Sequence, residues 1–106
     1  MAITADVNLG NGVTASSCYI IVPAAYVKKF VSVDGNNTAT FKLIYDVHIY
    51  QNKEARDHVD RLGKHIRCPE VDRFKIDYDV GASDNPFVLA YTDLKTNSKL
   101  SSVADA

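Results

Sequence analysis

Hydrophobic and polar residues alternate along several stretches of the chain, as they do in a β-strand that buries one face. The longest such stretch spans residues 41–49. Its apolar face carries Phe41, Leu43, Tyr45, Val47 and Ile49, and its polar face carries Lys42, Asp46 and His48. Burial of large apolar side chains contributes roughly 1.5–3 kcal/mol each. We therefore expect this segment to be the central strand and the largest contributor to the core.

Four other segments have β-strand character and are separated by turn-forming residues. They span residues 3–9, 15–22, 28–34 and 73–80. The first precedes Gly10-Asn11-Gly12, whose glycines adopt positive φ readily. The second is expected to stop at Pro23, which has no N–H for a sheet ladder. The third is expected to turn at residues 34–37 into the central strand, because Asp-Gly-Asn-Asn is typical of hairpin loops.

A helix is predicted near the end of the chain. Pro86 suits the first helical position, and Asp84 or Asn85 suits the N-cap. The apolar stripe at helical spacing consists of Phe87, Ala90, Tyr91 and Leu94. Lys95 falls in the last turn, where a cation is favoured by the helix dipole. The small, polar residues 101–106 that follow are expected to be mobile unless a partner holds them.

Residues 53–62 allow two interpretations. Ala55, Val59 and Leu62 have helical spacing, Asn52 can cap the start and Gly63 can end the helix in a left-handed conformation. The segment is therefore either a short helix or an irregular loop. Taken together, the elements predict an α+β, mainly β fold, with an antiparallel sheet of about five strands and a C-terminal helix packed on it. At 106 residues the chain is expected to form a single domain over residues 1–106.

The charge balance and the apolar runs restrict the class of partner. Twelve Lys and Arg against thirteen Asp and Glu give a formal charge of −1, whereas nucleic-acid-binding domains present a basic face. No apolar run approaches the roughly 20 residues of a membrane helix, and residues 1–6 lack the parts of a signal peptide. We therefore expect neither nucleic acid nor a membrane as a partner, and we expect synthesis in a cytoplasm. In that compartment Cys18 and Cys68 should be reduced and buried, with a disulfide that forms late as the alternative.

The strongest candidates for a metal site are His58, His65 and Cys68, with His48 as a further ligand, because imidazole and thiolate suit zinc. Only His65 and Cys68 are closely spaced, and no second pair completes four ligands. Ser17 and Cys68 lack the sequence context of a positioned nucleophile. The sequence therefore predicts no metal, no cofactor and no catalytic residue, and the chain is not expected to be an enzyme.

Two further features allow a ligand-binding alternative. Asp77 and Asp79 share one face of a predicted strand and resemble a paired-carboxylate site, although the solvated side of an amphipathic strand is the simpler explanation. The six tyrosines and four phenylalanines include residues that can stack on a sugar or a base, but most of them fall on predicted core positions. The alternative function is a small β-rich module that binds a carbohydrate or a cation.

Three segments together resemble a loose group of small bacteriophage proteins. They are residues 8–14 (NLGNGVT), residues 52–56 (NKEAR) after a long strand, and residues 90–96 (AYTDLKT). The group has an L-x-N-G turn near the start, an E-A-R segment after a hairpin and a closing A-Y-x-x-L-K-T helix. The resemblance implies a structural protein of a virion, from the tail, baseplate, collar or capsid decoration, without cofactor or catalytic residues.

The resemblance also implies the partners. A virion protein of this kind binds other phage structural proteins and forms a homo-oligomer, in which edge strands or terminal arms add to a neighbour's sheet. The apolar residues Ile3, Val7 and Leu9, in a strand near the N-terminus, are the candidate interface. On this hypothesis the protein is made in the host cytoplasm and resides in the virion.

Overall fold

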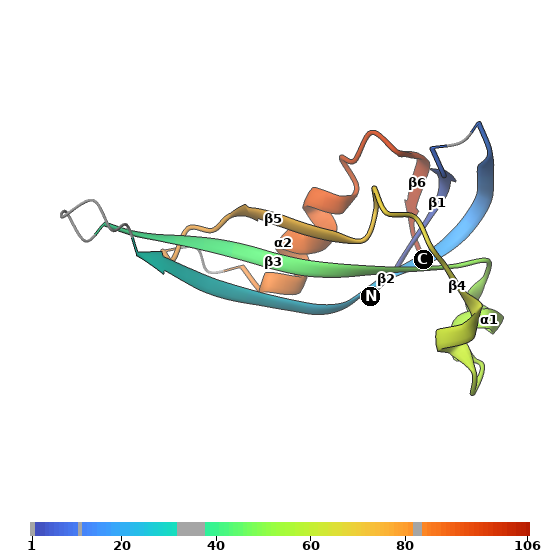
Figure 1. The fold of residues 1–106 in the computed structure, drawn as a ribbon, viewed down its shortest axis with the longest axis horizontal. Helices are drawn as coiled ribbons and strands as arrows, with labels where there is room; N and C mark the ends of the chain where they lie inside the picture. The colour runs from blue at the N-terminus through green and yellow to red at the C-terminus, as the bar shows by residue number, and fades with distance from the viewer. Residues whose placement is uncertain (1, 11, 32–37, 82–83) are drawn as a thin grey trace.

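An antiparallel sheet forms most of the protein, and one helix, α2, packs on one of its faces (Figure 1). The computed structural model describes residues 2–10, 12–31, 38–81 and 84–106. The elements in chain order are β1 (Ile3–Asn8), β2 (Thr14–Val31), β3 (Ala39–Tyr50), α1 (Lys53–Asp57), the 3-10 helix η1 (Arg61–Lys64), β4 (His65–Ile66), β5 (Arg73–Asp77), α2 (Pro86–Leu94) and β6 (Leu100–Asp105). Among these elements, no helix is both long and apolar enough to cross a membrane.

The strands follow the order β4-β3-β2-β1-β6, and β5 pairs with β3 on the same side as β4. Every pairing is antiparallel. The expected fold class is confirmed: the protein is mainly β, with an antiparallel sheet and the C-terminal helix packed on it. β3 has partners on both sides over most of its length, as expected for a central strand.

The core lies between the sheet and α2. Leu43, Tyr45, Val47 and Ile49 of β3 are buried, as the alternation predicts, whereas Phe41 is only half-buried. The other buried members of the core come from most elements of the chain: Ile3, Ala5, Val7, Cys18, Ile20, Val22, Cys68, Val71, Ala90, Tyr91, Leu94 and Leu100. Cys18 and Cys68 are free and buried, as the sequence predicts.

The expected end of the second strand at Pro23 is wrong. β2 continues to Val31 because the pairing with β3 is irregular between Ile21 and Ala24, and a bulge accommodates a residue without an N–H. The bulge also changes which residues face α2. The pairing Ile20 to Ile49 precedes it and Ala25 to Tyr45 follows it, so the apolar positions shift from even to odd numbers. The hairpin loop expected at 34–37 lies outside the described residues.

Helix α2 begins and packs largely as predicted. The Asn85 side chain caps it by accepting a hydrogen bond from the Phe87 N–H at 2.8 Å, and Pro86 occupies the first turn. Ala90, Tyr91 and Leu94 are buried. Phe87 is a correction to the predicted stripe: 39% of its surface is exposed, because it lies in the first turn, at the end of the helix–sheet contact.

Residues 53–62 form neither one continuous helix nor an irregular loop. Helix α1 is capped by Asn52, whose side chain accepts from the Ala55 N–H at 2.9 Å, but it ends at Asp57. A separate 3-10 helix follows, and it includes Gly63. Gly63 therefore does not end a helix in the left-handed conformation, which the structure assigns to Gly10 and Gly12 in the first turn.

Two further expectations near the end of the chain need correction. Strand β5 ends at Asp77, so Val80 lies beyond it and is 62% exposed. The C-terminal residues, expected to be mobile, form β6 and pair with β1 from Ile3–Asp105 to Val7–Leu100. Leu100 anchors this strand in the core, and Ala106 donates its N–H to the Ala2 carbonyl at 3.0 Å.

Candidate interaction surface

Ile3, Val7 and Leu9 were expected to form an interface, but they do not lie on the surface. β1 pairs with β2 on one side and with β6 on the other, so it has no open edge. Ile3 and Val7 are fully buried, and Leu9 is half-buried against the core. The prediction is wrong because the C-terminal residues pair with β1 and turn a terminal strand into an interior one. An interaction surface must therefore be sought elsewhere.

Strand β5 has the most regular open edge in the described part of the chain. It pairs with β3 from Lys42–Asp77 to Asp46–Arg73. The Tyr78 N–H donates to the Phe41 carbonyl, and the Val47 N–H donates to the Asp72 carbonyl. Backbone groups alternate between the two sides of an antiparallel strand. The N–H and C=O groups of Arg73, Lys75 and Asp77 therefore point away from β3, and no described strand pairs with them.

A row of charges covers the face of β3 and β5 opposite α2. Arg73 Nε lies 2.6 Å from Asp46 Oδ1, and Lys42 pairs with Asp77. The hydrogen bond from Lys42 lowers the pKa of Asp77, and the hydrogen bond to Asp46 raises the pKa of Arg73. Both pairs are exposed to solvent, so each contributes little to folding. Their main effect is to fix where positive and negative charge lie along the edge.

Lys75 lies between these two pairs, but its side chain turns inward across the sheet. Its Nζ lies 5.3 Å from the ring centroid of Phe30 on β2, a cation–π distance. Lys28 approaches the same ring at 5.3 Å. Because β3 separates β5 from β2, the ammonium group of Lys75 is drawn away from the open edge.

The hairpin formed by β2 and β3 carries apolar side chains outside the core. We name residues 26–31 and 39–44 the distal hairpin. Tyr26, Val27 and Val31 are each more than a third exposed, and Val31 is 52% exposed. β1 pairs with β2 only as far as Ile20, so the side of the distal hairpin away from β3 and β5 has no partner strand among the described residues. Figure 1 shows this part of the hairpin extending past α2.

An aromatic cluster lies at the other end of β3. The rings of His48 and His65 are 4.5 Å apart, and Tyr50 lies 5.8 Å from His65. Burial lowers the pKa of His65, His48 and Arg67 lower it further, and Asp72 opposes the change. A polar hollow of about 560 Å³ adjoins the cluster, lined by Arg56 and Arg61 among others.

The candidate metal ligands do not come together. His65 lies beside His48 with the two rings tilted by 49°, whereas Cys68 belongs to the hydrophobic core and His58 is exposed after α1. His58 accepts a hydrogen bond from the Asp60 N–H at 3.0 Å through its Nδ1. The residues described here include no group of three or more His, Cys, Asp or Glu arranged to hold a metal. Ser17 lies in β2, where its N–H donates to Asp6 Oδ1 at 2.8 Å.

The candidate carboxylates Asp77 and Asp79 lie beside a groove of about 400 Å³ between β5 and α2. Asp77 pairs with Lys42, and Asp79 accepts the Gly81 N–H at 2.9 Å. A third carboxylate, Asp93, accepts a hydrogen bond from the Tyr45 hydroxyl at 2.5 Å. Burial raises the pKa of Tyr45, and this hydrogen bond raises it further. All three carboxylates thus have partners within the chain.

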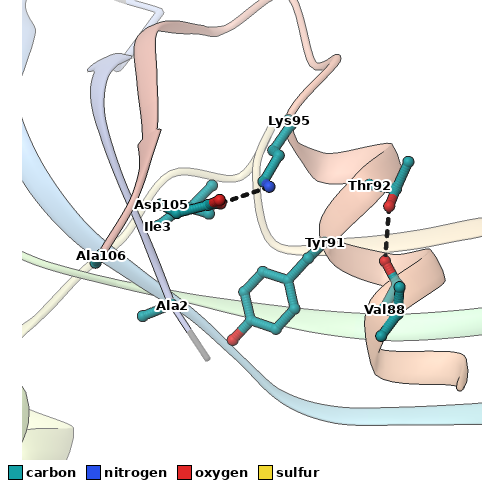
Figure 2. A pocket seen from close by; sticks show the side chains of 8 residues that line it. All are labelled: Ala2, Ile3, Val88, Tyr91, Thr92, Lys95, Asp105 and Ala106. Atoms are coloured by element: carbon teal, nitrogen blue, oxygen red, sulfur yellow. Dashed lines mark hydrogen bonds and ion pairs between the residues drawn. The ribbon is translucent and has the colours of Figure 1, made fainter.

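A small hollow of about 190 Å³ lies where α2 meets the ends of β1 and β6. Figure 2 shows Lys95 reaching from the end of α2 to Asp105 on β6, where Nζ and Oδ1 are 2.5 Å apart. Tyr91 lines the same hollow. This contact fixes β6 to the helix, and the hollow contains no cluster of reactive groups among its described lining residues.

Sequence reasoning did not identify the β5 edge as a surface. The only feature of the sequence that indicates this edge is the order Arg73-Phe74-Lys75-Ile76-Asp77, in which the first and last charges have opposite sign. Comparison with protein families, with curated proteins and with solved structures found no match to this chain.

Proposed function

We propose that this protein is a structural subunit of a bacteriophage virion, acting through protein–protein contacts in the tail, baseplate, collar or capsid decoration. The distal hairpin carries the proposal. Tyr26, Val27, Phe30, Val31 and Phe41 all lie outside the core cluster, on a hairpin whose β2 edge is unpaired in the described chain. Exposed apolar surface beside an open edge is typical of a contact with another chain.

The resemblance of residues 8–14, 52–56 and 90–96 to small phage proteins supplies the virion setting. The partners are copies of the chain and neighbouring structural proteins, and synthesis occurs in the host cytoplasm. The ligand-binding alternative has less support, because Asp77, Asp79 and Asp93 already bind groups of the same chain. A carbohydrate or cation would have to displace those partners.

Mass spectrometry of purified particles tests the setting. The chain should be present in particles made by the strain that carries its coding sequence, at a fixed ratio to other structural proteins. Its absence from every particle preparation, while it accumulates in the host, would contradict a virion role.

A pair of valine substitutions tests the surface. Val31→Asp places a charge on the distal hairpin, and Val59→Asp places the same charge on the turn after α1, where Val59 is 89% exposed. Val31→Asp should abolish incorporation into particles, and Val59→Asp should leave it unchanged. Thermal melts should show both variants folded. Equal incorporation of the two variants would contradict a role for the distal hairpin.

A further inference from the structure

The open edge of β5 is complementary to itself. If a second β5 is placed antiparallel beside it with Lys75 opposite Lys75, then Arg73 lies opposite the second copy's Asp77 and Asp77 lies opposite its Arg73. Opposite charges directly across an antiparallel pair are favourable. The charges continue inward on each side, because Asp46 neighbours Arg73 and Lys42 neighbours Asp77. Asp46, Arg73, and Asp77 and Lys42 of the second copy would then form a row of alternating charge across the contact. Each charge in this row has an opposite charge beside it.

The backbone agrees with the same register. Arg73, Lys75 and Asp77 direct their N–H and C=O groups outward, as derived from the bonds of Tyr78 and Val47 to the neighbouring strand. In the proposed register each of these residues lies opposite another of the three. All the pairs are then hydrogen-bonded pairs, in which both residues exchange N–H···O=C bonds. A shift by one residue would place outward-facing groups opposite groups that point back to β3.

The one like-charge pair in this arrangement is Lys75 with its copy. The structure already separates the two ammonium groups, because each Lys75 extends back over its own sheet to Phe30. On the α2 face, Phe74 would lie opposite the second copy's Ile76. Both side chains are half-buried and packed against the core, and the facing pair would cover their remaining exposed surface.

We propose that β5 is the site at which a second copy of this chain binds, forming a twofold-symmetric dimer with one continuous sheet. This inference rests on the proposed function and names one of its partners. Charged edge strands also protect sheets from pairing. Protection needs only charge of either sign, whereas the arrangement here places Arg73 and Asp77 each opposite the complementary charge of the second copy. In a twofold contact the same patch serves both copies, as self-complementarity requires.

Lys75→Pro and Lys75→Ala form a matched pair of variants. Both remove the ammonium group, but only proline removes the outward N–H, and proline is tolerated where the N–H of an edge strand faces solvent. Analytical ultracentrifugation of the full chain should show dimers of the wild type and of Lys75→Ala. Lys75→Pro should raise the dissociation constant at least about tenfold, because two hydrogen bonds across the symmetric contact are lost. Equal dissociation constants for the two variants would overturn the proposal.

Crosslinking tests the register if Lys75→Pro fails to fold. Lys75→Cys puts two thiols opposite each other at the twofold axis, within reach of a short bismaleimide. Thr40→Cys puts an exposed thiol on the distal hairpin, on the part of β3 beyond its pairing with β5. Lys75→Cys should crosslink to a dimer nearly completely, and Thr40→Cys and the wild type, with its buried cysteines, should not. Failure of Lys75→Cys to crosslink overturns the proposal.

The results also separate this inference from the proposed function. A wild type that remains monomeric up to about 1 mM overturns the β5 dimer, but if it is still present in particles the virion role stands. Conversely, a chain that dimerises through β5 but is absent from particles supports the dimer and contradicts the virion role. Association that is weakened by Val31→Asp and not by Lys75→Pro overturns the β5 dimer and assigns assembly to the distal hairpin alone.

Discussion

The hydroxyl oxygen of Tyr91 accepts a hydrogen bond from the backbone N–H of Val22 at 2.8 Å, and both residues are buried. The bond joins the middle of α2 to the bulge of β2. Val22 immediately precedes Pro23, at the place where the ladder between β2 and β3 is irregular. A bulge leaves backbone groups outside the ladder, and a buried N–H without a partner is costly. Tyr91 thus satisfies a donor that the bulge removes from the sheet.

Tyr91→Phe should therefore destabilise the protein by about 1–3 kcal/mol, because it removes this acceptor and leaves the ring in place. Urea unfolding followed by circular dichroism measures the change. Tyr26→Phe is the matched control, since Tyr26 is a partly exposed tyrosine of β2, the strand that contains Val22. This substitution should change the free energy of unfolding by less than about 0.5 kcal/mol. Equal effects of the two substitutions would show that the bond to Val22 contributes nothing.

The same bulge explains how far the sequence predicts the fold. Uninterrupted alternation predicts strands at 41–49 and 73–80, and the structure has a strand at each place because a constant period indicates one buried face, although the second strand ends at Asp77. The sequence divides β2 at Pro23 because proline has no N–H for a sheet ladder. In the structure a bulge lies there, and the apolar positions change from even to odd across it. A single sequence does not distinguish a bulge from the end of a strand when the residue involved is proline. The helix at Pro86–Leu94 was predictable because its cap, its proline and its stripe agree.

His65 should make stability fall as the solution is acidified. Its pKa in the folded chain lies below the ordinary value of 6.5, so the unfolded chain binds the proton more readily. The free energy of unfolding should then decrease from pH 7 to pH 5. His65→Gln should reduce this slope, and His58→Gln, which removes an exposed imidazole outside the cluster, is the matched control. Urea midpoints at both pH values measure it, and an unchanged slope for His65→Gln would contradict the burial of this ring.

Gly10→Ala should destabilise the first turn by about 1–2 kcal/mol, because Gly10 has φ of +85°, a conformation that side chains with a Cβ avoid. A Cβ there would also lie 3.3 Å from Glu70 Oε1, and the other oxygen of this carboxylate, Oε2, is held by Lys99 Nζ at 2.7 Å. Gly63→Ala is the control, since Gly63 has open space around it and lies in η1. Differential scanning calorimetry should show a lower Tm only for Gly10→Ala.

The candidate surface was less predictable than the fold. Ile3, Val7 and Leu9 satisfy every local criterion for a terminal strand that binds a partner, and only the pairing of β6 with β1 excludes it. The sequence of β6 gives no sign of a strand, because Ser101 and Ser102 are small and polar. The structure adds an irregularity that periodicity does not predict, since Ser102 adopts φ of +52°. The pairing of β6 with β1 joins residues far apart in the sequence, and local periodicity does not predict such pairings. The edge of β5 is visible only once β3 is known to occupy its other side.

Thiol reactivity should report on local opening near both cysteines. Cys18 is 1% exposed in β2, between β1 and β3, and burial raises the pKa of its thiol. Cys68 is 4% exposed in the segment between β4 and β5. Because a connecting segment opens more readily than an interior strand, Ellman's reagent should modify Cys68 first and Cys18 only at the rate of global unfolding. Cys18→Ala and Cys68→Ala assign the two phases. A faster phase from Cys18 would mean that β2 opens before the segment that precedes β5.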